Sequence, residues 1–317
     1  MRAVTWLDRH ARSWRLGVGR VDDGRVVVTD ETPPDDLPHL EGVVTGAFTD
    51  AHVHLALVDL APLATSALGM VLDLGSALGS LAPVPGVTIR FAGAFLTPPG
   101  GYPSDRAWAP TGSVREIPDA EAAASAVAEM KDAGATCIKV ASNRTAGPVF
   151  SDELFAAIVR IAASVDLTVV AHAEGPGEAQ RVARLGAGVL AHAPFSERLT
   201  DDEIAAQAGS VRWISTLAIH EGETYDIAVD NVRRFRAAGG TVHYGTDMGN
   251  GPTPVGLNAG EIAALRDAGI DGADLLRALS PGDPLDAATR LLFSPGATPE
   301  TADPLHARPL TPADLEA

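Results

Sequence analysis

The sequence predicts an α/β chain whose main part is a (β/α)8 TIM barrel. Three observations predict it: eight short apolar segments follow one another, amphipathic helical segments separate most of them, and several of these helical segments end on glycine. Strands that alternate with helices favour a parallel sheet, and eight such units favour a barrel. The length of 317 residues suits one large barrel, and 46% hydrophobic residues are enough to form its core.

The predicted strands follow an N-terminal hairpin at residues 14–29, in which Asp23-Gly24 is a two-residue turn signal. The eight strands are residues 49–54, 70–75, 88–95, 137–141, 167–174, 188–194, 213–218 and 241–247. Two of the helical segments between them begin after the capping residues Asp119 and Ser151, and the first of these ends at Gly134. Each unit is therefore predicted to be a strand followed by a helix with a defined end.

The chain divides into three predicted segments. Residues 46–295 form the barrel, residues 1–45 contribute the N-terminal part of a small, curtailed β-subdomain, and residues 296–317 are a tail that returns to it. Residues 96–118 are rich in proline and glycine and follow the third strand. This stretch should lie at the mouth of the barrel, where it is either a lid or a plain long loop.

Composition narrows the classes of partner. The net charge of −17 argues against nucleic acid and against anionic membrane surfaces, both of which favour basic patches. The only cysteine, Cys137, rules out a disulfide within the chain and a thiolate zinc cluster. No apolar run is long enough to span a membrane, and the N-terminus lacks the pattern of a signal peptide. We expect a cytoplasmic protein that acts on a small molecule, with the oligomeric state open and a homo-oligomer among the options.

Ionisable side chains gather at the ends of the predicted strands. In a strand, His52 and His54 share one face. Four further groups lie in or near the ends of other strands: Lys139, His172, His192 and Asp247. A lone histidine in an apolar strand is usually a hydrogen-bonded core residue, but the strand ends of a barrel converge on one mouth. Since imidazole nitrogen and carboxylate oxygen are metal ligands, the combination predicts a metal site.

Five stretches together resemble a known family. They are GAFTDAHVHL, CIKVAS, VVAHAEG, LAHA and GTDMG. They are similar to motifs of the amidohydrolase superfamily, in the branch where a carboxylated lysine bridges two metals. The resemblance covers about residues 40–295 and is nearest to imidazolonepropionase-like and dipeptidase-like members.

The resemblance implies a role for each strand-end group. His52, His54 and Asp247 would hold the more buried metal ion, and His172 and His192 the more exposed one. Lys139, as N6-carboxylysine, would bridge the two ions. Carboxylation would also remove the cost of burying an unpaired ammonium group in an apolar strand. The expected cofactors are two divalent ions, zinc first, with manganese, cobalt or iron as alternatives.

The same resemblance implies a hydrolase that acts on C–N bonds. A hydroxide that bridges the metals would attack a peptide, N-acyl or cyclic amide, an imide or a lactone. Asp247 would be the catalytic residue, first as general base and then as general acid. One alternative is a mononuclear-metal deaminase of an aminated heterocycle in the same superfamily, and another is a barrel kept as a binding or scaffold protein.

Four residues are predicted to bind the substrate. Arg144 follows the fourth strand, where its guanidinium could clamp a substrate carboxylate in a bidentate pair or lie solvated in a loop. His220 follows the seventh strand and should reach the mouth. Tyr102 and Tyr225, together with Trp108, are candidates for the walls of the pocket.

Overall fold

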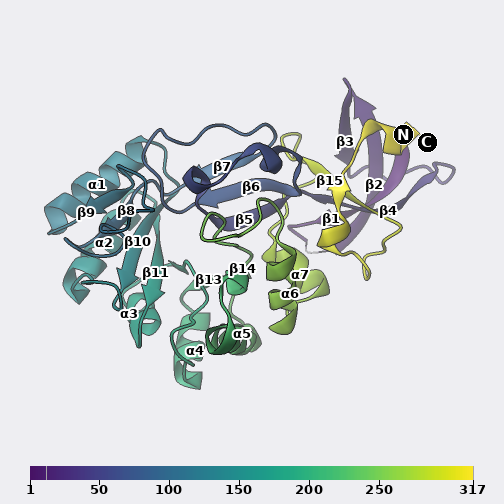
Figure 1. Ribbon diagram of the computed structural model, residues 1–317. Coiled ribbons are helices and arrows are strands. Elements are labelled where there is room, and N and C mark those ends of the chain that lie inside the picture. Colours follow the sequence, from purple (N-terminus) through teal and green to yellow (C-terminus); the bar gives the residue numbers. More distant parts are fainter. Residues whose placement is uncertain (12, 317) are drawn as a thin grey trace.

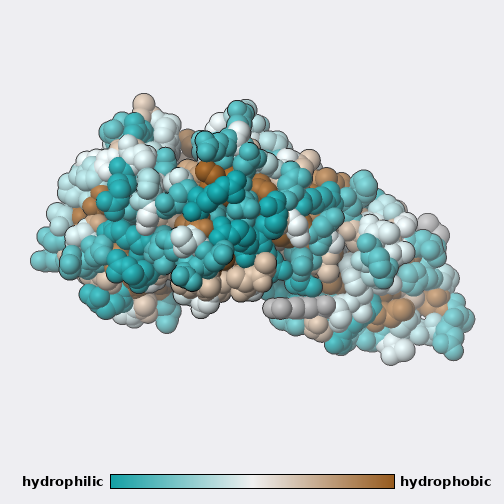
Figure 2. Space-filling model, turned by 90° about the horizontal axis from the view of Figure 1, so that it is seen from below, coloured by the Kyte–Doolittle hydropathy of each residue, from teal (hydrophilic) through white to brown (hydrophobic). Residues whose placement is uncertain are grey.

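The computed structural model describes residues 1–11 and 13–316 as an α/β molecule in two parts that lie end to end (Figure 1). The smaller part is a sheet built from strands of both ends of the chain, and the larger part combines parallel strands with helices. No helix in the described ranges combines the length and the apolar character needed to cross a membrane. Figure 2 shows one face of the molecule, on which hydrophilic residues predominate, as the charge of −17 leads us to expect.

Strands from both ends of the chain build the sheet of the smaller part. They are β1 (Arg2–Asp8), β2 (Ser13–Asp22), β3 (Arg25–Thr29), β4 (His39–Gly46), β15 (Leu291–Pro295) and β16 (Arg308–Pro309), in the order β16-β15-β4-β1-β2-β3. The predicted hairpin is confirmed, because β2 and β3 pair around Asp23 and Gly24, whose φ angles of 47° and 77° suit a tight turn. A separate apolar core that includes Trp6 and Phe293 lies against this sheet.

Parallel strands form the centre of the larger part. One sheet contains β5 (Phe48–Val53), β6 (Leu68–Asp73) and β7 (Thr88–Phe91). The other contains β8 (Phe95–Thr97), β9 (Val114–Glu116), β10 (Cys137–Asn143), β11 (Thr168–Glu174), β12 (Val189–Leu190), β13 (Arg212–Ile214) and β14 (Val242–His243), in the order β14-β13-β12-β11-β10-β8-β9. Main-chain hydrogen bonds also join β5 to the chain after β14, from Ala51 to Tyr244 and from Asp247 to His52.

These strands test the predicted architecture in part. The α/β class is confirmed, and each predicted strand overlaps an observed one. The described strands fall into two parallel sheets, so a closed eight-stranded barrel stays a prediction. The predicted strand at residues 88–95 is divided into β7 and β8, because Gly93 between them has a φ of 78° and interrupts the extended backbone.

Helices lie along the outer side of the larger part (Figure 1). They are α1 (Ala120–Asp132), α2 (Asp152–Ala163), α3 (Glu178–Arg184), α4 (Asp201–Ala208), α5 (Gly222–Ala237), α6 (Ala259–Asp267) and α7 (Gly272–Ala278), with α8 (Pro312–Glu316) at the C-terminus. Short 3-10 turns are η1 (Leu55–Leu57), η2 (Ala61–Thr65), η3 (Leu217–Ile219) and η4 (Pro304–His306). Both predicted caps are confirmed, since the side chains of Asp119 and Ser151 accept hydrogen bonds from the first turns of α1 and α2.

The segment at residues 96–118 contains turns and the short strand β9. It is tied back on itself by the main chain of Gly100, which donates a hydrogen bond of 2.7 Å to Glu116 Oε1. The segment reaches the cavity described below through Tyr102 and Trp108. Whether it opens and closes as a lid stays a prediction.

Candidate metal centre

A cavity of about 760 Å³ lies where the polar groups of the strand ends meet. Its lining includes all six predicted metal ligands, which we call the cavity floor: His52, His54, Lys139, His172, His192 and Asp247. Each of these side chains is buried. The structure therefore brings together residues that lie far apart in the sequence, from His52 to Asp247.

Three donor atoms of the floor converge closely. His52 Nε2 lies 3.3 Å from His54 Nε2, and Asp247 Oδ1 lies 3.1 Å and 3.2 Å from these two nitrogens. Two ligands that each bind a tetrahedral zinc ion at about 2.0–2.1 Å lie about 3.3 Å apart. The three distances therefore match three ligands around one ion.

The electrostatics of these groups suit a metal ion. Burial lowers the pKa of His52, and the charge of Lys139 lowers it further, so the ring is neutral with a free lone pair. Burial by itself raises the pKa of Asp247, but His52 and His54 hold it well below its usual value. Within the described ranges, Asp247 Oδ1 and His54 Nδ1 are buried without a hydrogen-bond partner. A neutral ring and a carboxylate with an unsatisfied oxygen fit a divalent cation.

The groups behind the ligands orient them. His52 Nδ1 lies 2.7 Å from the main-chain oxygen of Ala191, to which a neutral ring donates, so Nε2 is left as the ligand atom. His192 Nδ1 lies 2.9 Å from Thr216 Oγ1, so this ring nitrogen is engaged in a hydrogen bond. Burial lowers the pKa of His192, and the neighbouring His52 adds to the effect.

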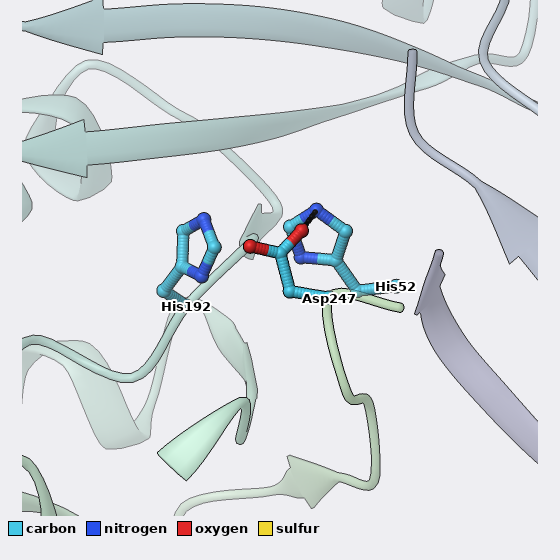
Figure 3. A group of neighbouring side chains, drawn as sticks. All are labelled: His52, His192 and Asp247. Atoms are coloured by element: carbon cyan, nitrogen blue, oxygen red, sulfur yellow. Dashed lines mark ion pairs between the residues drawn. The ribbon is translucent and has the colours of Figure 1, made fainter. Parts of the chain in front are cut away.

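Figure 3 shows how His52, His192 and Asp247 face one another, with the carboxylate between the two rings. Their donor atoms all lie within 4.8 Å of one another. The resemblance implied that His192 and His172 hold the second ion. In the structure, the donor atom of His192 lies near those of His52 and Asp247, which the resemblance assigned to the first ion. His172 lies beside His192, with ring centroids 4.9 Å apart, and its Nε2 lies 3.2 Å from Glu174 Oε2.

The backbone around Asp247 is held from several sides. Its φ of 54° lies in the left-handed region, which aspartate tolerates better than most residues. Its main-chain nitrogen donates to His52 O at 2.8 Å, and its Oδ2 accepts from Asn250 Nδ2 at 2.8 Å. The buried Asp50 accepts hydrogen bonds from the main chains of His52 and Thr246, so it ties β5 to the segment that contains Asp247.

Lys139 lies at the bottom of the floor on β10. Its Nζ lies 3.4 Å from His52 Nε2, and across the described ranges no salt bridge pairs it with a carboxylate. Burial lowers the pKa of Lys139 to about 8, although Asp247 opposes the shift. A substantial fraction of this amine is therefore neutral just above neutral pH, and a neutral amine is the form that reacts with carbon dioxide.

The structure divides the four predicted substrate-binding residues. Tyr102 and His220 line the cavity. Arg144 and Tyr225 are not among the residues that line it, and their substrate-binding role stays a prediction. Arg144 donates through Nε and Nη2 to the buried Glu178, at 3.0 Å and 2.8 Å, because that carboxylate needs a partner. Tyr225 donates from its hydroxyl to Asp267 Oδ2 at 2.7 Å.

Three contributors were missed from the sequence. Asn250 holds Asp247, Thr216 holds His192, and Phe195 lines the cavity with its ring 6.1 Å from that of His192. Each lies just after a predicted strand or at its end, so position alone was a usable signal. None of the three is a usual metal ligand, so residue type does not mark them in the sequence.

Comparisons with known proteins bear on the fold. No protein-family model matches the chain, and no curated protein matches its sequence. Solved structures do match. A. niger ochratoxinase is 15% identical with a TM-score of 0.72, over 97% of this chain and 94% of that one. An amidohydrolase is 17% identical with a TM-score of 0.69, over 98% of each chain. The chain therefore shares the fold of these two solved structures.

A third solved structure agrees with this assignment. A Xaa-Pro dipeptidase with methionine bound in its active site is 15% identical with a TM-score of 0.66, over 94% of each chain. The fold of these solved structures agrees with the predicted resemblance to the amidohydrolase superfamily. At such low identity, a shared fold does not by itself specify the reaction or the substrate.

Proposed function

We propose that the chain is a metal-dependent hydrolase that cleaves an amide or a related C–N bond of a small molecule on a (β/α)8 barrel. One observation supports this above all: His52 Nε2, His54 Nε2 and Asp247 Oδ1 lie 3.1–3.3 Å apart on the floor of a large cavity. The fold that the chain shares with a solved amidohydrolase agrees with it. Imide and lactone substrates belong to the same proposal.

In this proposal, two divalent ions, zinc first, occupy the floor. His52, His54 and Asp247 would hold one, His172 and His192 the other, and Lys139 would bridge them once it is carboxylated. Bound metal ions of this kind lower the pKa of water and polarise a carbonyl group. The unpaired, partly neutral amine of Lys139 supports the modification, because a carboxylated lysine is an anion that neighbouring cations stabilise.

Asp247 is the proposed proton carrier. Its Oδ2 is held by Asn250, while its Oδ1 faces the two histidines and is otherwise unpartnered within the described ranges. The carboxylate can take a proton from the attacking water and pass it to the departing nitrogen, as general base and then general acid. The hydrogen bond from Asn250 fixes which oxygen faces the floor during both transfers.

His220 is the proposed polar contact to the substrate. It lines the cavity, and burial lowers its pKa to about 4, so its ring is neutral near pH 7. Among the described side chains, His220 Nε2 is a buried atom without a hydrogen-bond partner. A polar group of a bound substrate would satisfy it.

The test is an activity screen with metal analysis on the same sample. Metal-replete protein, prepared with bicarbonate, is assayed on dipeptides, N-acyl amino acids, cyclic imides and lactones. We expect hydrolysis of at least one class, loss of activity on chelation, recovery on adding zinc, and two ions per chain. Tyr225→Phe, outside the cavity, is the control that should keep its activity. Full activity of metal-free protein would refute the proposal.

A single-ion deaminase is the second candidate. The observation in its favour is the grouping of His52, His192 and Asp247 within 4.8 Å, which describes one ion better than two. Glu174, whose Oε2 lies 3.2 Å from His172 Nε2, would then be the carboxyl group that transfers protons during the reaction. One ion per chain and release of ammonia from an aminated heterocycle would favour this candidate over the hydrolase.

A further inference from the structure

Aromatic rings surround the cavity above its floor. We call this region the outer wall and define it by Phe95, Tyr102, Trp108, Phe195 and His220, all of which line the cavity. Trp108 connects one side, with ring centroids 6.0 Å from Tyr102 and 6.2 Å from Phe95. Phe195 and His220 lie together on the other side, 4.4 Å apart.

The outer wall has no cation. Among the described residues that line the cavity there is no arginine, and Lys139, the one lysine, is part of the floor. Arg144 is held by Glu178 outside the cavity. Arg106 lies 5.6 Å from the Tyr102 ring and 3.4 Å from Asp105, and it is also absent from the lining.

Carboxylates lie in the lining instead. Glu174 lines the cavity and is anchored by Asn143 Nδ2, which donates to it at 2.7 Å. Glu221 lines the cavity from an exposed position just before α5. A negatively charged substrate group beside these side chains would meet repulsion, without the guanidinium or ammonium that usually binds carboxylates.

We infer that the part of the substrate beyond the scissile bond is uncharged and aromatic: a neutral aryl or arylalkyl amide, carbamate or urea. This inference rests on the proposed hydrolase function. It excludes free dipeptides and N-acyl amino acids as preferred substrates, because their carboxylate would lie unpaired against the outer wall. The cavity of about 760 Å³ accommodates a molecule with two rings, which is of ordinary ligand size. The neutral ring of His220 supplies the polar contact that an uncharged group can accept.

The test compares two compounds that differ in one carboxylate. N-benzoyl-phenylalanine and N-benzoyl-2-phenylethylamine have the same acyl group and the same aromatic amine side. With metal-replete protein we expect kcat/KM to be about tenfold or more higher for the neutral compound, because burying an unpaired charge is costly. Equal or faster hydrolysis of the carboxylate compound would overturn the inference.

A binding measurement separates this inference from the proposed function. The dissociation constants of both compounds are measured by calorimetry with the Asp247→Asn variant, in which we expect hydrolysis to be slow. Tighter binding of the neutral compound supports the inference even if wild-type protein hydrolyses neither. Absence of hydrolysis by metal-replete wild-type protein contradicts only the hydrolase proposal, whereas tighter binding of the carboxylate compound contradicts the inference.

A charge reversal gives a second test. Glu221→Arg places a guanidinium at the outer wall and should raise the ratio of carboxylate to neutral kcat/KM by about tenfold. Glu223→Arg is the matched control, because Glu223 is exposed on α5 and does not line the cavity. We expect the control to leave the ratio unchanged. If the ratio of carboxylate to neutral kcat/KM is the same in both variants and in wild type, the outer wall does not select substrates by charge.

Discussion

The floor and the outer wall of the cavity are built from different parts of the chain. Floor groups such as His52 and Lys139 lie on strands and are almost fully buried. Trp108 of the outer wall lies in a turn-rich segment and is 40% exposed. Under the proposed function, the strands would position part of the reactive floor, and the turn-rich segment with Trp108, together with Phe95 on β8, would contact the variable part of the substrate.

The histidines of the floor and of the outer wall also differ in their hydrogen-bond partners. His52 and His192 are each oriented by a hydrogen bond to the ring nitrogen that faces away from the metal site. In the outer wall, by contrast, His220 Nε2 has no partner among the described residues. Under the proposed function, a metal ion would satisfy Asp247 Oδ1 in the floor, and a polar group of the substrate would satisfy His220 Nε2 in the outer wall.

The largest expected effect tests the floor. Asp247→Asn should lower kcat/KM by about 10²–10⁴, because an amide cannot accept the proton that a carboxylate transfers. The backbone should not suffer, since asparagine also tolerates the left-handed φ of 54° at this position. Steady-state kinetics and thermal unfolding measure the two effects. Wild-type activity in this variant would remove Asp247 from the mechanism.

The next prediction concerns the support behind the outer wall. Glu261 on α6 is fully buried and accepts a hydrogen bond of 2.7 Å from the main chain of Ala218, in the turn that leads to His220. Burial raises the pKa of Glu261 to about 7 from an ordinary 4.5. Between these two values the folded state binds more protons than the unfolded state, so stability falls as pH rises.

We therefore expect Glu261→Gln to gain stability relative to wild type between about pH 5 and about pH 8, by a difference on the order of 3 kcal/mol. Urea unfolding of both proteins at each pH measures it. The pKa of Asp50 is also raised to about 7, first by burial and in addition by the charge of Glu261, so Asp50 adds to the slope in both proteins but less in the variant. A stability difference that does not change with pH would show that Glu261 ionises normally.

A smaller effect is expected where the floor is held in place. Thr216→Val removes the hydroxyl that lies 2.9 Å from His192 Nδ1 and should weaken metal affinity by about 10–100-fold. Valine is β-branched like threonine, so the two residues should have a similar conformational cost at the unusual φ of 43°. Thr216→Ser keeps the hydroxyl and should restore most of the affinity. Competition with a chelator is the measurement, and equal affinity in all three proteins would contradict the role.

The smallest effect belongs to the outer wall. Trp108→Ala should raise KM for a neutral aryl substrate by about two- to tenfold and leave kcat unchanged, because it removes aromatic contacts only. An aliphatic amide of similar size is the control, for which KM should change less. A large fall in kcat would instead show that Trp108 acts on the floor, whose His54 ring lies 6.5 Å away.

The contrast between floor and outer wall also separates what could be predicted. Strand-end positions identified all six floor residues, because a parallel α/β topology brings the carboxyl ends of strands together whatever the loops do. Arg144 follows a strand end too, yet it faces Glu178, which is 34 residues away in sequence. A loop side chain is oriented by such distant partners, and no local pattern reveals them.

By itself the sequence determined the α/β class, the approximate strands, the hairpin at Asp23-Gly24 and the set of groups that could hold a metal. These follow from periodicity, turn chemistry and residue type, which are local properties. Tertiary structure alone decided that β15 pairs with β4 across the ends of the chain. It also decided that Tyr102 and Trp108 meet above the floor and that His192 joins His52 and Asp247. These are long-range packing outcomes, settled by which buried groups need partners and which surfaces fit.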